Sequence, residues 1–209
     1  MFRVLTVARE YGSAGGAIAR RVAEILRWNL LDKNLVEAIA RSAQVDPDLV
    51  RRYDERPDSW LHRVSRRGLW HGALEAVATV TDAEFFDAET MTALARNLIT
   101  EAYSKGKCVI VGRGAQCVLQ DCQDVLHVFV RAPWSDRMDR VQARVPGERD
   151  VEQLIRCIDQ QRAGHIATYF GYNWKDPRLY QMLISSELGE EHVARTIIEV
   201  IQSEVRKVA

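Results

Sequence analysis

Three glycines within five residues near the start of this chain restrict its fold more than any other feature. Gly12, Gly15 and Gly16 separate a short apolar segment, residues 4–7, from residues 17–27, whose apolar side chains recur at spacings of three and four. This pattern predicts a strand, a tight and irregular loop, and a helix. Because the first N–H groups of a helix lack partners inside it and carry partial positive charge, the loop is a candidate anion site.

The rest of the 209-residue chain alternates between predicted strands and predicted helices. The strands cover residues 28–32, 108–111, 125–130 and 181–185, and the helices cover residues 34–43, 87–104, 133–144, 150–169 and 190–207. Residues 108–111 are apolar throughout, as in a strand that is buried on both faces of a parallel sheet. We therefore expect a single α/β domain over residues 1–209, a three-layer α/β/α sandwich around a parallel sheet, with a helical insertion at residues 46–86.

Charge and cysteine content argue against several classes of protein. The 29 Lys and Arg residues balance the 29 Asp and Glu residues, so neither nucleic acid nor an anionic membrane is an expected partner. No apolar run is long enough to span a membrane, and residues 1–3 lead directly into a strand, so we expect a cytoplasmic protein. The four cysteines form no Cys-x-x-Cys pair and no metal-ligand spacing with the histidines; we expect idle thiols and no metal site built from them.

The glycine loop differs from the usual phosphate-binding P-loop, G-x-x-x-x-G-K-S/T. Aligned over residues 10–17, it retains only Gly15. Gly16 occupies the position of the lysine that contacts the outer phosphates, and Ala17 occupies that of the hydroxyl that binds magnesium. The loop is therefore either a phosphate cradle or a structural turn, and its place at the first strand–helix junction favours the cradle.

Several arginines follow a predicted strand or recur on one helix. Arg113 stands between two glycines after the strand at 108–111, where it would bind phosphate or pair with a helix end. Arg140 and Arg144 lie either on a solvated helix face or in a site. The position of Arg137 beside neighbouring aspartates favours a solvated face with local ion pairs.

Three further charged residues allow both a structural and a binding interpretation. Asp32 precedes a predicted helix, which it would cap, and a cap is compatible with contact to a ligand. Asp159 and Arg162 are three residues apart and share one helix face. Their spacing alone indicates a surface ion pair.

Motifs along most of the chain match those of one protein family in the same order. Residues 8–16 resemble its REYGSGG opening, residues 30–33 its YDKEL segment, residues 109–114 its VIVGRG segment, Ile158-Asp159 with Arg162 its ID..R helix, and residues 176–189 its closing DP..Y…INTSRLG segment. The chain thus resembles the cytidylate kinase-like family, a branch of the nucleoside monophosphate kinases, from residue 6 to about residue 198 and least clearly across residues 46–86.

The resemblance implies a P-loop nucleoside monophosphate kinase-like fold. It also implies transfer of the γ-phosphoryl group of ATP, with Mg²⁺, to a nucleoside monophosphate such as CMP or dCMP. The implied site residues are Arg9, Gly12, Ser13, Ala14, Gly15 and Gly16 at the ATP phosphates, Asp32 and Lys33 at the mouth of the acceptor site, Arg113 on the acceptor phosphate, and Asp159 and Arg162 at the cytidine end and the acceptor.

The resemblance also assigns larger parts of the chain. Arg140 and Arg144 would belong to a lid over residues 140–175, and would act with Arg113 and Arg162 as catalytic cations. The insertion at residues 46–86 would lie on the acceptor side. The implied partners are small-molecule nucleotides, and a homodimer is an option that the sequence leaves open.

The absent lysine leaves three functions open. The first is a kinase in which Arg9, Lys33, Arg140 or Arg144 supplies the missing positive charge. The second is a nucleotide-binding sensor without turnover, and the third is a protein-interaction domain that kept the fold and lost the ligand. The glycine loop and the Gly-Arg-Gly segment at residues 112–114 argue against the third function.

Overall fold

The computed structural model describes residues 2–32 and 88–203. In order, the elements are β1 (Val4–Arg9), α1 (Gly15–Leu26), β2 (Asn29–Leu31), α6 (Ala88–Lys105), β3 (Cys108–Val111), α7 (Ala115–Val118), β4 (Val125–Arg131), α8 (Trp134–Arg144), α9 (Val151–Phe170), the 3₁₀ turn η1 (Pro177–Leu179), β5 (Met182–Ser185), the 3₁₀ turn η2 (Ser186–Leu188) and α10 (Glu190–Gln202). The predicted helix at 34–43 and the predicted insertion at 46–86 lie outside the described residues.

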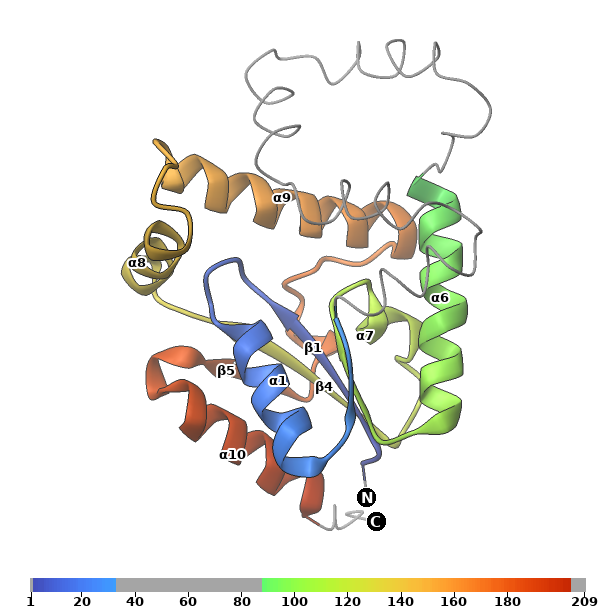
Figure 1. The fold of residues 1–209 in the computed structure, drawn as a ribbon. Coiled ribbons are helices and arrows are strands. Elements are labelled where there is room, and N and C mark those ends of the chain that lie inside the picture. Colours follow the sequence, from blue (N-terminus) through green and yellow to red (C-terminus); the bar gives the residue numbers. More distant parts are fainter. Residues whose placement is uncertain (1, 33–87, 204–209) are drawn as a thin grey trace.

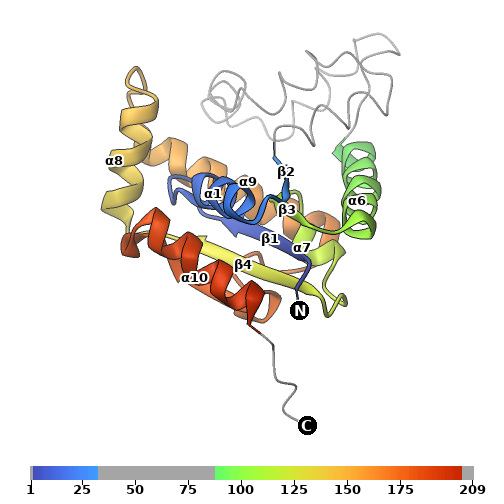
Figure 2. The ribbon, with the colours of Figure 1, turned by 60° about the horizontal axis from the view of Figure 1, so that its bottom comes forward.

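The strands of the described residues form one parallel sheet in the order β2-β3-β1-β4-β5. Val7 of β1 pairs with Val111 of β3 on one side and with Val128 of β4 on the other. Because all strands run the same way, the segments that follow them meet at one edge of the sheet. Helix α9 crosses over this carboxyl edge, with α8 and α6 at opposite ends of the molecule (Figures 1 and 2).

Helices cover both faces of the sheet, which confirms the predicted three-layer architecture. Helices α1 and α10 pack on one face through buried residues such as Ile18 and Ile197, which contact a cluster that includes Leu5 of β1. On the other face, Ile99 of α6 packs in a cluster with Ile110, and α7 and α9 complete that layer. The continuous apolar character of the central strands follows from this burial on both sides.

Element boundaries differ from the sequence predictions by a few residues. Helix α1 begins at Gly15, two residues earlier than expected, because the glycines themselves form its first turn. The four-residue helix α7 was not predicted, since so short a segment carries no helical periodicity. In the described part of the chain, no helix has the length and apolar character needed to cross a membrane.

Polar and thiol groups inside the core are electrically neutral. Thr6 Oγ1 lies 2.6 Å from Nδ1 of the buried His127, whose Nε2 lies 3.3 Å from the carbonyl oxygen of Leu119. Burial lowers the pKa of His127, although the bond to that carbonyl opposes the shift. Burial also raises the pKa of Cys108 and of Cys117 to about 11, so both thiols stay protonated, as expected for idle cysteines.

Candidate functional site

Residues 10–14 connect β1 to α1 in a loop that packs too tightly for larger residues at two of its glycines. Gly12 has a φ of +81°, and a Cβ there would lie 2.9 Å from the carbonyl oxygen of Arg137 on α8. A Cβ on Gly15 would lie 2.6 Å from the Cβ of Arg9. Both positions therefore require glycine for steric reasons.

The start of α1 offers backbone N–H groups that have no partner within the helix. The first helical bond runs from the N–H of Ile18 to the carbonyl oxygen of Ala14, at 3.0 Å, and no side chain caps this end. The N–H groups of Gly15, Gly16 and Ala17 precede that bond. Among the described residues, a Cβ on Gly16 would meet no atom within 4 Å, so there is space beside Gly16 in the first turn of the helix. Such an arrangement fits a phosphate group.

The same helix end provides no side-chain ligand for a metal ion. Ala17 has no hydroxyl group, and the hydroxyl of the buried Ser13 donates to the carbonyl oxygen of Glu10 at 2.8 Å. Among the described residues, no group of three or more His, Cys, Asp and Glu side chains could hold a metal. The backbone of this helix end thus fits a phosphate group, and Mg²⁺ would be held here mainly by the phosphates of the nucleotide.

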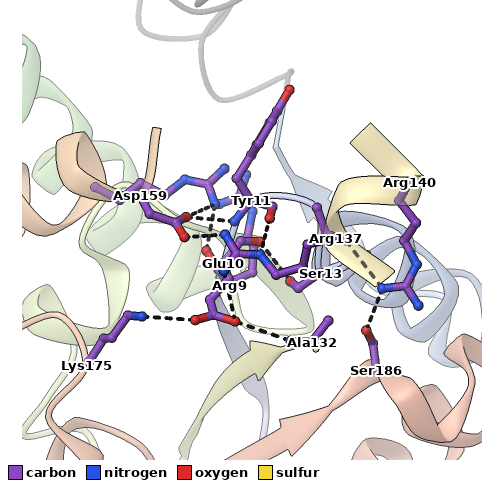
Figure 3. Close-up of polar contacts among 12 residues, drawn as sticks. Arg9, Glu10, Tyr11, Ser13, Ala132, Arg137, Arg140, Asp159, Lys175 and Ser186 are labelled. Atoms are coloured by element: carbon purple, nitrogen blue, oxygen red, sulfur yellow. Dashed lines mark hydrogen bonds and ion pairs between the residues drawn. The ribbon is translucent and has the colours of Figure 1, made fainter. Parts of the chain in front are cut away.

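Three arginines from α8 and α9 bind the carbonyl oxygens of the loop. Arg162 donates to the carbonyl oxygen of Arg9 at 2.7 Å, and Arg137 donates to that of Tyr11 at 2.7 Å. Arg140 donates to the carbonyl oxygen of Gly12 at 3.4 Å and to the hydroxyl of Ser186 at 3.1 Å (Figure 3). Predicted site residues Arg140 and Arg162 therefore lie at the loop, where they support its backbone.

A buried ion pair fixes the centre of the loop. The side chain of Arg137 is only 6% exposed and pairs with the carboxylate of Asp159, which also accepts the N–H of Tyr11 at 2.8 Å (Figure 3). The prediction that Arg137 lies on a solvated face was therefore wrong. Val141, four residues further along α8, is fully buried, and that shared helix face was the signal in the sequence.

Glu10 joins the loop to two other segments, and the sequence analysis missed it. Its carboxylate accepts Lys175 Nζ at 3.0 Å and the N–H of Ala132 at 3.3 Å, and lies 3.6 Å from Arg137. This glutamate lies within the REYGSGG-like motif, whose order of residues gave no role for a carboxylate. Its contacts come from residues more than 120 positions away, so no local spacing could reveal them.

The ring of Tyr11 lies close to two arginines that were predicted to be catalytic. The guanidinium carbon of Arg144 is 4.9 Å from the ring centroid, and that of Arg162 is 5.6 Å from it. Cation–π attraction favours both positions. Burial, followed by the positive charge of Arg9, lowers the pKa of Arg162 to about 9, so this side chain is still protonated at neutral pH.

The turn after β3 brings Arg113 to the same edge of the sheet. Gly112, Arg113 and Gly114 have φ values of +76°, +60° and +72°, and a Cβ on Gly114 would lie 2.4 Å from the Phe170 ring of α9. Burial, together with the positive charge of Arg113, lowers the pKa of His165 on α9. Arg113 therefore lies on the side of the edge that faces the second half of α9.

Arg9 and Asp32 complete the described part of this edge. A Cβ on Gly112 would lie 2.4 Å from Nη1 of Arg9, so the Arg9 side chain reaches from β1 to the turn that carries Arg113. Asp32 directly follows β2, whose Leu31 pairs with Ile110 of β3. Lys33 lies outside the described residues, so its predicted role stays a prediction.

The predicted lid at 140–175 contains a helix that belongs to the core. Ile166 of α9 packs in a cluster with Phe129 of the sheet, and Ile155 packs against Val141 of α8. Closure of the whole segment would separate Ile166 from Phe129, whereas the contact between Ile155 and Val141 lies within the segment. The exposed turn at Pro146-Gly147 lies outside them, so the lid stays a prediction and any hinge would have to lie near this turn.

The fold and the site can now be compared with known families. They consist of a parallel sheet in this strand order, a glycine loop that leads into α1, and the turn that carries Arg113 after the neighbouring strand β3. The model of the cytidylate kinase-like family matches residues 4–188. This chain belongs to the cytidylate kinase-like family. A curated cytidylate kinase from Methanosarcina mazei is 24% identical over 100 residues, which are 47% of this chain. The match spans 56% of that relative, about half of its length.

Solved structures show the same fold at lower sequence identity. An uncharacterized protein from Eubacterium ventriosum has a TM-score of 0.68 at 20% identity, with 96% of this chain and 99% of the other covered. Shikimate kinase from Acinetobacter baumannii, in complex with shikimate, has a TM-score of 0.55 at 15% identity, with 99% and 97% covered. A gluconokinase from Sinorhizobium meliloti has a TM-score of 0.52 at 12% identity, with 95% and 90% covered. These likenesses confirm the P-loop kinase-like fold.

Membership of the cytidylate kinase-like family supports phosphoryl transfer as the class of chemistry. The family match includes the glycine loop, the turn at residues 112–114, and α8 and α9. The structure brings most of the predicted site residues to one sheet edge in two groups, one at the glycine loop and one at Arg113. Their individual roles in binding and catalysis stay predictions.

Proposed function

We propose that this chain is an ATP-dependent kinase that phosphorylates a nucleoside monophosphate, with CMP or dCMP as the acceptor. The observation that carries the proposal is the start of α1, where the N–H groups of Gly15, Gly16 and Ala17 have no partner within the helix and where, among the described residues, a Cβ on Gly16 would meet no atom within 4 Å. This helix end lies one strand away from the Arg113 turn, because β1 and β3 are neighbours in the sheet. A phosphate donor and a phosphate acceptor can therefore be held side by side.

The residues of the chain would divide the work between binding and charge neutralisation. The N–H groups of Gly15, Gly16 and Ala17 would bind the donor phosphates, and Arg113 would fork onto the acceptor phosphate. A guanidinium group has five N–H donors, so Arg140 and Arg162 can hold loop carbonyls and still donate to a phosphate. Mg²⁺ bound to the nucleotide would supply further neutralisation of phosphate charge.

The absent lysine predicts slow turnover. A single charge-stabilising contact typically changes the rate by ~10²–10³. Several cations near the loop already have partners: Arg140 and Arg162 donate to loop carbonyl groups, Arg144 lies over the Tyr11 ring, and Lys175 pairs with Glu10. We expect the arginines to compensate in part.

A nucleotide-binding module without turnover is the alternative, and one observation favours it. Gly16 replaces the lysine, Ala17 lacks the hydroxyl, and the Ser13 hydroxyl is used inside the loop. Binding of a polyphosphate requires only the cradle, whereas transfer also requires cations around the transferred group.

A coupled ADP-release assay with Mg-ATP separates the two functions. CMP, dCMP, UMP, AMP and GMP serve as acceptors, and Arg113→Asn is the test variant because asparagine tolerates the positive φ at this position. Arg195→Asn, at an exposed pair on α10, is the matched control. The kinase is supported if the wild type releases ADP with one of these acceptors, if Arg113→Asn abolishes that release, and if Arg195→Asn retains it. ATP binding by calorimetry without release supports the module, and the absence of both contradicts the two together.

A further inference from the structure

The backbone of the glycine loop is bonded to side chains along its length. The carbonyl oxygens of residues 9, 10, 11 and 12 accept hydrogen bonds from Arg162, Ser13, Arg137 and Arg140, respectively. The N–H groups of Glu10, Tyr11 and Ser13 are also bonded within the protein, to Val130, Asp159 and Glu10, respectively. The loop shape is thus set by protein contacts before any ligand binds.

Arg137 and its partner Asp159 differ from Arg140 and Arg162 because they are less exposed and together hold both sides of one residue. Asp159 Oδ1 accepts the N–H of Tyr11, and Arg137 Nε donates to its carbonyl oxygen. The two side chains pair with each other, and they are 6% and 15% exposed. By contrast, the side chains of Arg140 and Arg162 are 32% and 26% exposed.

Both oxygens of the Asp159 carboxylate are already used by the protein. Oδ1 accepts the Tyr11 N–H and lies 4.0 Å from Arg162, while Oδ2 accepts from Arg137. Each oxygen can accept a second bond, but a hydroxyl that bonds here would have to fit beside an ion pair whose side chains are 6% and 15% exposed. Removal of one partner from such a pair leaves a buried charge uncompensated, so exchange of partners is unfavourable.

We propose that Arg137 and Asp159 are positioning residues that hold the glycine loop in shape for the donor phosphates, so that Asp159 serves the donor side of the site and not the nucleoside of the acceptor. The proposal rests on the proposed function, in which this loop binds the polyphosphate of ATP. Asp159 acts through Tyr11 and the loop backbone. It therefore affects donor binding without touching the donor.

The test compares Asp159→Asn with Glu152→Gln, which makes the same carboxyl-to-amide change at an exposed ion pair on α9. Asparagine retains an oxygen for the Tyr11 N–H but loses the charge that pairs with Arg137, which lowers stability. Arg137 keeps its bond to the Tyr11 carbonyl oxygen and lies 3.6 Å from the Glu10 carboxylate, so we expect the fold to persist, and thermal unfolding of both variants checks this. Calorimetry measures the affinities for ATP and for CMP separately. We expect Asp159→Asn to weaken ATP binding about tenfold and leave CMP binding within twofold of wild type, with Glu152→Gln unchanged for both.

Two outcomes of the titrations overturn the proposal. One is a loss of CMP affinity with ATP affinity retained, which would place Asp159 in the acceptor site as the family resemblance implies. The other is unchanged ATP affinity in both Asp159→Asn and Arg137→Lys. If Arg137→Lys does not fold, the result for Asp159→Asn decides alone.

Amide hydrogen exchange separates failure of this inference from failure of the proposed function. Without nucleotide, the N–H groups of residues 11–16 should exchange faster in Asp159→Asn than in Glu152→Gln, because the loop is less fixed. If wild-type protein binds no ATP, the proposed function fails and the exchange data alone judge the positioning role. Equal exchange rates in Asp159→Asn and Glu152→Gln overturn the positioning role. This also holds if Asp159→Asn binds both ATP and CMP more weakly than wild type.

Discussion

At the scale of single residues, the three glycines of the loop have different reasons to be glycine. Gly12 and Gly15 lie against Arg137 and Arg9, where a Cβ would approach to 2.9 Å and 2.6 Å. Gly16 faces open space and shows no steric need for glycine. The residue that departs most from the usual P-loop is therefore also the one that can be changed without disturbing the fold.

Gly16→Lys should tighten ATP binding. The new side chain would start from the open position in front of α1 and would add a charged donor to the phosphates. A hydrogen bond to a charged group contributes about 1.5–3 kcal/mol, so we expect the dissociation constant to fall at least about tenfold. Calorimetry at constant salt measures the change. Gly147→Lys, at an exposed and equally open glycine, controls for the added charge; equal affinity in both variants would mean that the triphosphate does not lie at Gly16.

Residue spacing in the sequence identified the loop and its glycines, but not what holds the loop. Tyr11 and Asp159 are 148 positions apart, and Arg137 meets Tyr11 across 126 positions. Such pairs depend on how α8 and α9 return to the carboxyl edge of the sheet, which no local pattern encodes. The aspartates near Arg137 therefore predict a surface residue. The apolar Val141, four residues later on the same helix face, is the feature of the sequence that indicates burial.

At the scale of elements, strands were easier to predict than helices with functional roles. Strands β3 and β4 are apolar because they are buried on both faces, so composition alone marks them. Helix α9 is 20 residues long and contacts the core through different faces at its two ends, so no single apolar stripe runs along it. Its existence could be predicted, whereas its position across the site could not.

Two glycines of α9 should respond in opposite directions to the same substitution. Gly164 lies within the helix, and a methyl group added there would meet no atom of the described residues within 4 Å, so Gly164→Ala should stabilise the protein by about 0.5–1 kcal/mol. Gly171 ends the helix with a φ of +74°, so Gly171→Ala should destabilise it by about 1 kcal/mol. Urea unfolding measures both. Loss of stability in Gly164→Ala would mean that this face of α9 is covered.

At the scale of the whole molecule, buried histidines make stability depend on pH just below neutrality. His127 joins β1 to β4 through Thr6 and is buried as a neutral imidazole. Its pKa in the folded protein is below the usual 6.5. The unfolded chain therefore binds a proton more readily than the folded protein when the pH falls below about 6.5.

Stability should consequently be highest above pH 6.5 and should decrease as the pH falls toward 5. His165, whose pKa is also lowered, contributes in the same direction. Thermal unfolding of wild type and His127→Gln over this range measures the effect. Glutamine keeps a polar group near Thr6 but cannot titrate, so its melting temperature should fall less steeply with acidification. Parallel curves for the two proteins would contradict a neutral, buried His127.

The central claim is that the start of α1 binds a polyphosphate within a loop held by arginines. A crystal structure with a non-hydrolysable ATP analogue tests this directly. We predict a phosphate within hydrogen-bond distance of the N–H groups of Gly15, Gly16 and Ala17, with the Arg137–Asp159 pair intact. An empty helix end, or an analogue bound elsewhere at saturating concentration, would contradict the claim.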